Sequence, residues 1–401
     1  MNFEELGLGA RLVSRLEGLG LTTPTPIQAK AIPHALEGRD ILGIAQTGTG
    51  KTAAFGIPLV VALSRHQERP APKSARGLIL APTRELANQI VESLQGLTRD
   101  LRINLVVGGK SINAQAQKLA RGTDILVATP GRLIDLMDRR AVDLGRTRFL
   151  VLDEADQMLD IGFVHALRRI APMLGSDRQT MMFSATMPKA MAELSRSYLD
   201  DPVRVEVSPP GKVADRVAHS VHFVPKAEKQ ELLIALLDGH RDDRALVFLR
   251  TKHGAERLMK QLERAGFAAT SIHGNKSQGQ RDRAIAAFKS GKVRVLVATD
   301  VAARGIDIPG VGHVYNYDLP NVPENYVHRI GRTARAGREG RAIAFCAADE
   351  VSELKAIEKV LGTSIETAGG TRWAHADAPA KPQGKRRTRR RPAGRSRRMA
   401  A

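Results

Sequence analysis

Short apolar runs that alternate with helical patterns constrain the fold of this 401-residue chain more than any other feature. The runs are continuous, whereas the segments between them, such as residues 85–97, follow a helical pattern. Strands that are apolar along their whole length are typical of parallel sheets covered by helices on both faces. We therefore expect an α/β fold. The runs lie at residues 78–80, 125–127, 149–152, 181–183, 245–249, 293–297 and 313–317.

The series of runs is interrupted once, by the sequence SPPGK at residues 208–212, which is typical of a linker. We expect a first domain over residues 1–207, a linker over 208–216 and a second domain over 217–370. Each domain would be a mainly parallel sheet flanked by helices, with a cleft between the two domains. At roughly 150 residues per domain, the chain length agrees with two domains and a tail.

The remaining residues, 371–401, differ from the rest in charge. Within them, residues 381–398 hold ten Lys or Arg side chains, no acidic side chain and almost no apolar one. Such a segment cannot bury a core, so we expect a disordered basic tail. Blocks of like charge often bind nucleic acid, although a solvated tail without a specific role has the same composition.

The charge of the whole chain narrows the class of partner. Sixty-two Lys and Arg residues against 42 Asp and Glu residues give a net charge of +20. This excess favours a polyanion, which is either nucleic acid or an acidic membrane surface. The sequence has no run of about 18 apolar residues and does not begin like a signal peptide, so we expect no membrane span. The single cysteine, Cys346, excludes an intrachain disulfide and fits a reducing cytoplasm.

The clearest chemical signature is a phosphate-binding loop that follows an expected strand at residues 41–44. Residues 45–52, AQTGTGKT, match such a loop, with Ala45 where the usual pattern has its first glycine. The glycines let backbone N–H groups surround the phosphates, and the following helix adds its dipole. We expect Lys51 to reach the β- and γ-phosphates and Thr52 to hold Mg²⁺ through its hydroxyl.

A hydrolytic site of this kind needs acidic partners at the end of a neighbouring strand. The apolar run 149–152 ends in the residues DEAD, of which Asp153 and Glu154 come first. We expect Asp153 to hold Mg²⁺ through water and Glu154 to act as the general base that polarises the attacking water. Phosphoryl transfer requires little covalent chemistry from the protein, so positioning and charge stabilisation would carry the reaction.

The same four letters name the DEAD-box RNA helicases, and the chain resembles this family from Phe3 to about Gly337. Each matching block is weak alone, but their joint order and spacing are very specific, and Ala45 is a normal variant in the family. The further blocks are PTPIQ at 24–28, PTREL at 82–86, GG at 108–109, TPGR at 129–132, SAT at 184–186, HG at 273–274 with Gln278 and Arg281, ATD at 298–300, RGID at 304–307, and HRIGR at 328–332 with Arg335.

The resemblance implies two RecA-like domains that bind ATP and Mg²⁺. Gln28 would hydrogen-bond the adenine edge with its amide and Phe3 would stack on the ring, in a segment over residues 3–28. A core position for Phe3 and a surface position for Gln28 are the alternatives. The nucleotide-binding residues would be Phe3, Gln28, Ala45, Gln46, Thr47, Gly48, Thr49, Gly50, Lys51, Thr52 and Asp307, of which Asp307 would bind the ribose.

Other residues would act on the γ-phosphate or relay its state. Arg332 and Arg335 lie three residues apart, so on a helix both face one way, and they would reach across the cleft as arginine fingers. His328 would join the network around Glu154. The coupling residues would be Ser184, Thr186, Asp156 and Arg304.

The resemblance also places RNA across both domains, on the face opposite ATP. Aromatic residues make up only 4% of the chain, so contacts to phosphate, sugar and 2′-hydroxyl groups fit better than stacking platforms. The expected contacts are Pro82, Thr83, Arg84, Gly109, Thr129, Pro130 and Arg132 in the first domain, and Arg250, Gly274 and Thr299 in the second.

Three functions fit these features. The first is an ATP-dependent RNA helicase that unwinds short duplexes or remodels RNA–protein complexes. The second is an ATP-gated RNA clamp with little unwinding, and the third is a translocating DNA helicase, which the DEAD block and Gln28 disfavour. The resemblance to short bacterial members of the family implies a role in ribosome assembly, RNA decay or cold adaptation, and the sequence does not choose among them. We expect a cytoplasmic monomer whose partner is RNA, with a ribosomal precursor or the RNA-decay machinery.

Overall fold

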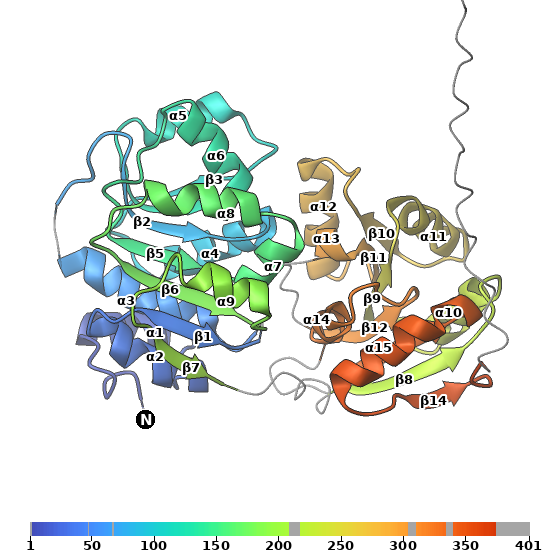
Figure 1. The fold of residues 1–401 in the computed structure, drawn as a ribbon. Coiled ribbons are helices and arrows are strands. Elements are labelled where there is room, and N and C mark those ends of the chain that lie inside the picture. The colour runs from blue at the N-terminus through green and yellow to red at the C-terminus, as the bar shows by residue number, and fades with distance from the viewer. Residues whose placement is uncertain are drawn as a thin grey trace, which may run out of the picture.

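The computed structural model describes residues 2–46, 48–65, 68–207, 217–303, 310–333 and 340–373. They form two α/β units side by side, each built on a seven-stranded sheet (Figure 1). All the strand pairs in both sheets are parallel, as the continuous apolar runs predicted. The expected linker, 208–216, and most of the expected tail lie outside the described residues. No helix in the described ranges is long and apolar enough to span a membrane.

The first sheet has the strand order β3-β4-β2-β5-β6-β1-β7. Its central strands are buried on both faces, and β6 is buried at every residue. Close packing is visible at Gly43 of β1, where a Cβ atom would lie 2.5 Å from the Phe183 ring of β6. The strands are β1 (Ile41–Ile44), β2 (Ala75–Leu80), β3 (Ile103–Val106), β4 (Thr123–Ala128), β5 (Phe149–Leu152), β6 (Gln179–Ser184) and β7 (Val203–Glu206).

Helices cover both faces of the first sheet. One hydrophobic cluster packs four of them on one face, and a second cluster packs the other five on the opposite face. The first four are α1 (Ala10–Gly18), α2 (Pro26–Leu36), α3 (Lys51–Arg65) and α4 (Arg84–Leu97). The other five are α5 (Ile112–Leu119), α6 (Pro130–Asp138), α7 (Ala155–Asp160), α8 (Val164–Ile170) and α9 (Lys189–Ser195), and a 3₁₀ turn, η1 (Ala171–Met173), follows α8.

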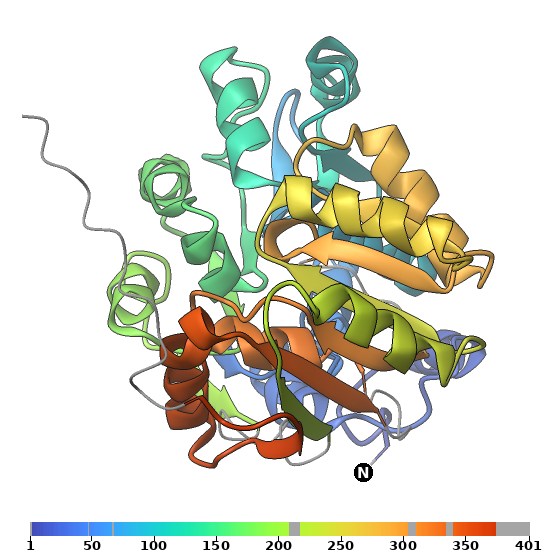
Figure 2. The ribbon, with the colours of Figure 1, turned by 90° about the vertical axis from the view of Figure 1, so that its right-hand side faces the viewer.

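The second sheet repeats the pattern with the order β10-β11-β9-β12-β13-β8-β14. Helices α10 and α11 cover one face, toward the viewer in Figure 2, and α12 to α15 cover the other. The strands are β8 (Ala218–Phe223), β9 (Arg244–Leu249), β10 (Ala269–Ile272), β11 (Val295–Thr299), β12 (Val311–Asn316), β13 (Arg341–Cys346) and β14 (Glu366–Gly369). The helices are α10 (Lys229–Asp238), α11 (Lys252–Arg264), α12 (Gln278–Lys289), α13 (Asp300–Ala303), α14 (Glu324–Ile330) and α15 (Val351–Leu361), with the 3₁₀ turn η3 (Ala348–Glu350) before α15.

In each unit the loops that follow the strands emerge at a single edge, because all the strands run in the same direction. In open α/β sheets, ligands bind at this carboxyl edge. Nearly all the expected site residues follow strands, so the fold brings them to these two edges.

Candidate functional site

The phosphate loop follows β1 and leads into α3, as the sequence predicts. Gly48 and Gly50 have φ angles of 87° and 91°, in the left-handed region that favours glycine. A Cβ atom at Gly50 would lie only 2.5 Å from Nε2 of Gln28, so the loop could not take a larger residue there. Thr49 Oγ1 donates to the carbonyl of Gln46 at 2.7 Å, which fixes the turn.

Lys51, the first residue of α3, is 5% exposed and lies beside the acidic block. Its Nζ atom is 4.0 Å from Oδ1 of Asp153, and it has no hydrogen-bond acceptor among the described residues. A buried ammonium group without acceptors is costly unless an anion satisfies it. The phosphate groups of a nucleotide fit this requirement, whereas Mg²⁺ binding by Thr52, the next residue, stays a prediction.

The carboxyl group of Asp153 is almost fully buried at the end of β5. Burial raises its pKa to about 6, the Lys51 charge opposes this rise, and the neighbouring Glu154 adds to it. The backbone N–H of Glu154 donates to Asp153 Oδ1 at 3.0 Å. A desolvated carboxylate beside a phosphate site is well suited to a hydrated divalent cation.

Glu154 has a left-handed backbone, with φ 50° and ψ 51°, immediately before α7. This conformation is uncommon for a residue other than glycine and costs of the order of 1–3 kcal/mol. The residue is 2% exposed. Strain of this kind is concentrated at functional sites, and here it falls on the residue expected to be the general base.

Asp156 connects the acidic block to the loop after β6. Its Oδ2 atom accepts from the backbone N–H groups of Ala185 and Thr186, at 3.1 and 2.9 Å, and from Thr186 Oγ1 at 3.0 Å. Ser184 Oγ donates to the carbonyl of Thr186 at 2.6 Å. The backbone N–H of Ala45 in turn donates to the Ser184 carbonyl at 2.9 Å. Of the four expected coupling residues, Asp156, Ser184 and Thr186 therefore connect the acidic block to the phosphate loop, while their relay role stays a prediction.

The two residues expected to read adenine already have protein partners. Gln28 is 1% exposed; its amide oxygen accepts from the backbone N–H of Thr25 at 2.9 Å, and its amide nitrogen donates to the Gly50 carbonyl at 3.0 Å. Phe3 is buried in the first hydrophobic cluster. Gln28 therefore lies against the phosphate loop rather than on the surface. Adenine reading by either residue stays a prediction, and for Gln28 it requires an exchange of hydrogen-bond partners.

In the second unit, His328 lies on α14 and Arg332 just beyond it. The helix ends at Ile330 and Gly331 caps it, so the expectation that Arg332 lies on a helix was wrong. Arg332 is 6% exposed, and its Nε donates back to the His328 carbonyl at 3.2 Å. Four expected site residues, Thr47, Arg304, Asp307 and Arg335, lie outside the described residues.

Most of the RNA-contacting residues expected in the first unit lie around one pocket of about 260 Å³. Gly109, with φ 78°, lies at its edge, where a Cβ atom would be 2.2 Å from Arg84 Nη1. Pro130 is the first residue of α6, and Arg132 Nη1 donates to the Lys110 carbonyl at 2.8 Å. The pocket is lined by Pro82, Thr83, Arg84, Glu85, Gly108, Thr129, Gly131, Arg132, Asp135, Ile161 and Phe163 of the first unit, with Arg281 and Val301 of the second.

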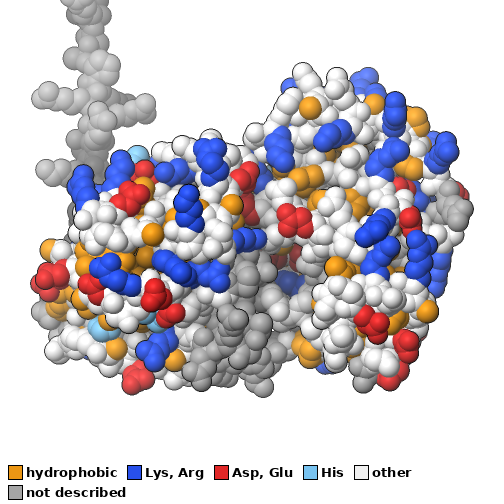
Figure 3. All heavy atoms as spheres, turned by 180° about the vertical axis from the view of Figure 1, so that it is seen from behind, with side chains coloured by type: hydrophobic (Ala, Val, Ile, Leu, Met, Phe, Trp, Pro, Cys, Tyr) orange, Lys and Arg blue, Asp and Glu red, His pale blue; other side chains and the backbone are white. Residues whose placement is uncertain are grey.

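The three expected RNA residues of the second unit also follow strands. Arg250 comes directly after β9, Gly274 lies in the loop after β10, and Thr299 ends β11. The space around Gly274 is open, with no atom within 4 Å of where a Cβ would stand. On the face shown in Figure 3, Lys and Arg side chains spread over both units, with acidic side chains among them.

The two expected sets of residues are separated along the carboxyl edge of each sheet. In the first unit, the RNA set follows the adjacent strands β3, β4 and β2, and the nucleotide set follows β5, β6 and β1. In the second unit, the RNA set follows β10, β11 and β9, and α14, with His328, comes after β12. The first sheet thus carries the expected RNA residues and the phosphate-binding and acidic residues on opposite halves of one edge, and in the second sheet His328 and Arg332 represent the nucleotide set among the described residues.

Direct contacts join the units beside the pocket. Arg281 Nη2 lies 3.1 Å from Glu85 Oε1, and Gln278 Nε2 donates to the same oxygen at 3.1 Å. Arg84 Nη1 donates to Gln278 Oε1 at 3.0 Å. All four residues belong to the sequence blocks that resemble the family, but the sequence predicted a role only for Arg84. The position of Glu85, Gln278 and Arg281 within these blocks is the only sequence signal that could have identified them.

Comparisons with known proteins agree with this geometry. Residues 25–194 match the DEAD/DEAH box helicase family, and residues 228–337 match the helicase conserved C-terminal domain. The DEAD-box ATP-dependent RNA helicase CshA of Bacillus cereus is 43% identical over 359 residues, which are 89% of this chain and 67% of that protein. The ATP-dependent RNA helicase CshA of Listeria monocytogenes is 42% identical over 378 residues, 94% of this chain and 72% of that protein.

A solved structure agrees over both units. The structure of S. cerevisiae Dbp5 bound to RNA and ADP BeF3 superposes with a TM-score of 0.80 at 32% identity, and it covers 92% of this chain and 95% of that one. The two RecA-like sheets expected from the sequence are thereby confirmed. From the family matches, the identity to these relatives and the shared fold, we conclude that this chain belongs to the DEAD-box ATP-dependent RNA helicases.

Proposed function

We propose that the chain binds single-stranded or locally structured RNA across both units and uses ATP binding and hydrolysis to unwind short RNA duplexes or to remodel RNA–protein complexes. One observation carries the proposal: the separation of the two sets of residues along the same edge of both sheets. When the units meet, ATP and RNA can then each be held by both units at the same time.

The nucleotide half supplies the chemistry. Lys51 would neutralise charge on the phosphates, Thr52 and, through water, Asp153 would hold Mg²⁺, and Glu154 would orient and deprotonate the attacking water. The metal ion would supply positive charge against the phosphates. Arg332 and Arg335 contribute positive charge from the second unit, which makes hydrolysis depend on contact between the units.

The half of the carboxyl edge that carries the expected RNA contacts would bind and open the duplex. Its hydroxyls, backbone amides and arginines hold one strand by phosphate and sugar, without reading sequence. When both units hold one RNA strand, they can fix its backbone in a conformation that differs from that of a regular duplex. Base pairs with the second strand are then lost, and a short duplex comes apart. We propose a ribosomal precursor or the RNA-decay machinery as the partner, with the protein acting as a cytoplasmic monomer.

A strand-displacement assay tests the proposal against both alternatives. Matched RNA and DNA duplexes of about ten base pairs are offered with ATP, with a non-hydrolysable ATP analogue, and with no nucleotide. We expect ATP-dependent displacement of the RNA strand and little of the DNA strand. ATP-dependent RNA retention without displacement would identify a clamp, and ATP-dependent displacement of the DNA duplex would identify a translocating DNA helicase.

A further inference from the structure

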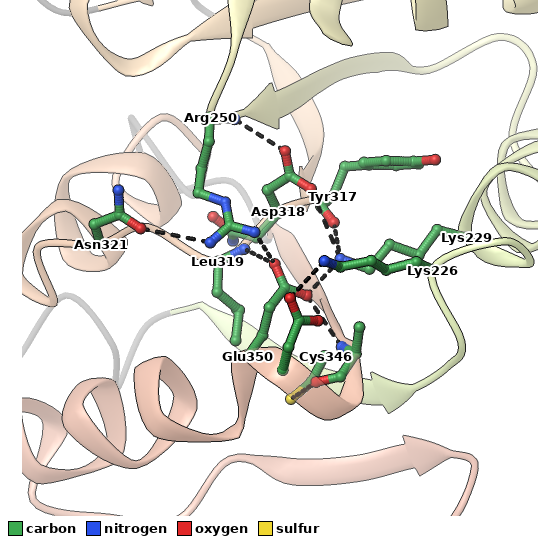
Figure 4. A network of polar contacts seen from close by, with 12 residues as sticks. Lys226, Lys229, Arg250, Tyr317, Asp318, Leu319, Asn321, Cys346 and Glu350 are labelled. Carbon is green, nitrogen blue, oxygen red and sulfur yellow. Dashed lines mark hydrogen bonds and ion pairs between the residues drawn. The ribbon is translucent and has the colours of Figure 1, made fainter. Parts of the chain in front are cut away.

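Glu350 lies at the centre of a polar network in the second unit, with 0% of its surface exposed (Figure 4). Its Oε2 atom accepts from Lys229 Nζ at 2.5 Å and from the backbone N–H of Ala347 at 3.0 Å. Its Oε1 atom accepts from Arg250 Nη2 at 3.0 Å and from the backbone N–H of Leu319 at 3.3 Å. One carboxylate thus joins the segments that follow the adjacent strands β9, β12 and β13.

The two cations that share Glu350 differ in exposure. Lys229 is 2% exposed and also donates to the Tyr317 carbonyl at 2.7 Å, so its ammonium group is committed to the interior. The Arg250 side chain is 27% exposed. A buried Lys–Glu pair contributes little net stability, because desolvation of the two charges offsets their attraction. The pair is therefore better explained by what it holds in place than by stability.

Arg250 is held at three points, of which the weakest is the bond that its guanidinium Nη1 donates to Asn321 Oδ1 at 3.5 Å (Figure 4). Besides the bond from its guanidinium group to Glu350, its backbone N–H donates to Asp318 Oδ2 at 3.0 Å. An arginine that is free to rotate loses side-chain entropy when it binds a phosphate, whereas one fixed beforehand loses less. Glu350 leaves the partly exposed end of Arg250 in one orientation at the RNA half of the carboxyl edge.

We propose that Glu350 is a positioning residue for RNA binding, which acts by holding the Arg250 guanidinium group toward the RNA backbone. This inference rests on the proposed function, in which Arg250 contacts RNA. Lys229 serves as the interior anchor that keeps the carboxylate oriented, through its hydrogen bond to Glu350 Oε2. Glu350 itself does not touch RNA.

The test is Glu350→Gln in the full chain, measured by RNA-stimulated ATPase activity. Glutamine keeps one acceptor oxygen, and the buried Lys229 requires that oxygen. The amide NH₂ group of the glutamine would therefore face the guanidinium group of Arg250, and because both groups are hydrogen-bond donors, the bond to Arg250 would be lost. We expect the RNA concentration for half-maximal stimulation to rise on the order of tenfold, the value of one charged hydrogen bond. kcat at saturating RNA should stay near wild type, and the log–log salt dependence of RNA binding should flatten by roughly 0.7, equivalent to one phosphate contact.

A double-mutant cycle separates this inference from the function on which it rests. Arg250→Ala should show the same defect, and the double variant should be no worse than Arg250→Ala alone. Normal RNA dependence in Glu350→Gln beside a defect in Arg250→Ala overturns the inference and leaves the proposed function standing. Normal RNA dependence in Arg250→Ala removes that residue from the RNA site and overturns the positioning role with it.

Two further variants guard against a simple folding defect. Asp349→Asn is the matched control, because this neighbouring carboxylate pairs with the exposed Lys226 instead, and RNA dependence should be normal. Lys229→Met combined with Glu350→Leu replaces the buried pair with apolar side chains, which usually preserves the fold. The RNA defect should persist in this variant, and normal RNA dependence there contradicts positioning.

Folding of each variant can be followed by the fluorescence of Trp373, the only tryptophan, whose Nε1 donates to the Cys346 carbonyl at 2.9 Å.

Discussion

Arg281 of the second unit lies 3.1 Å from the carboxylate of Glu85 in the first, across the pocket where the expected RNA contacts gather. Gln278 donates to the same carboxylate from the start of the same helix, α12. Both charged side chains are mostly buried. The pair therefore depends directly on contact between the two units, and it lies beside the expected RNA contacts.

Breaking this pair should weaken the coupling between RNA and hydrolysis. Arg281→Ala should lower the RNA-stimulated kcat/KM for ATP, because each unit alone holds only part of the nucleotide site. Glu85→Gln should act through the same contact, so the two changes together should be less than additive, with an interaction energy of about 0.5–3 kcal/mol. Arg283→Ala, on the exposed side of α12, is the control and should behave as wild type. Strictly additive effects would show that the pair does not act as a unit.

Loss of the general base should separate ATP binding from ATP turnover. Glu154→Gln keeps the size of the side chain but removes the charge that activates water. We expect turnover to fall by a factor on the order of 10²–10⁴, while ATP still binds through Lys51 and Thr52. RNA should stay bound longer in the presence of ATP, because the two units stay together on RNA until ATP is hydrolysed. ATPase activity near wild type, measured on the purified variant, would remove Glu154 from the chemistry.

Replacement of Gln28 should affect both nucleotide choice and the phosphate loop. Gln28→Ala removes two hydrogen bonds, to the Thr25 N–H and the Gly50 carbonyl. We expect weaker ATP binding by roughly 1–3 kcal/mol and a smaller gap between ATP and GTP. Titration of both nucleotides into wild type and variant decides the matter. If wild-type protein binds GTP as tightly as ATP, then Gln28 shapes the loop without reading the base.

The stability of the second unit should depend on pH through a pair of stacked histidines. The His240 and His313 rings are 3.5 Å apart and nearly parallel. Burial, and then the neighbouring His313, lower the pKa of His240 below its ordinary value of 6.5. The unfolded chain thus binds a proton more readily than the folded one, so this contribution to stability is complete above about pH 6.5 and is lost as the pH falls.

The variant His240→Gln should flatten that decline in thermal stability between pH 7.5 and 5.5. The decline should not vanish, because burial also lowers the pKa of His222. His253→Gln, at an exposed position on α11, should leave the pH profile unchanged. An identical profile for wild type and His240→Gln would show that the stacked pair does not contribute.

Deletion of residues 380–401 should change RNA affinity and leave the chemistry intact. The ten cations at 381–398 would tether RNA and raise its concentration near the two units. The RNA concentration needed to stimulate ATPase activity should rise, while the rate at saturating RNA stays close to wild type. Each lost phosphate contact should remove roughly 0.7 from the log–log salt slope, and we expect the deletion to remove a few contacts. An unchanged slope would leave the tail as solvated charge.

The sequence by itself determined the features that depend on neighbours along the chain. Continuous apolar runs specified parallel strands, and AQTGTGKT after the first run specified a phosphate loop at the start of a helix. The acidic block after β5 was equally readable, because its strand and its motif are adjacent. These are local signals, since a strand, a tight glycine turn and a helix start each involve a few consecutive residues.

The tertiary structure alone decided which distant residues meet. Glu350 and Arg250 are 100 positions apart, and no periodicity in either segment marks them as partners. Their contact exists because β9 and β13 flank β12 in the sheet, an order that packing of the whole unit selects. The same holds for Arg281 and Glu85, which meet only when the two units do. Arg332 lies beyond α14 because Gly331 caps that helix, although a three-residue spacing alone suggested a helical face.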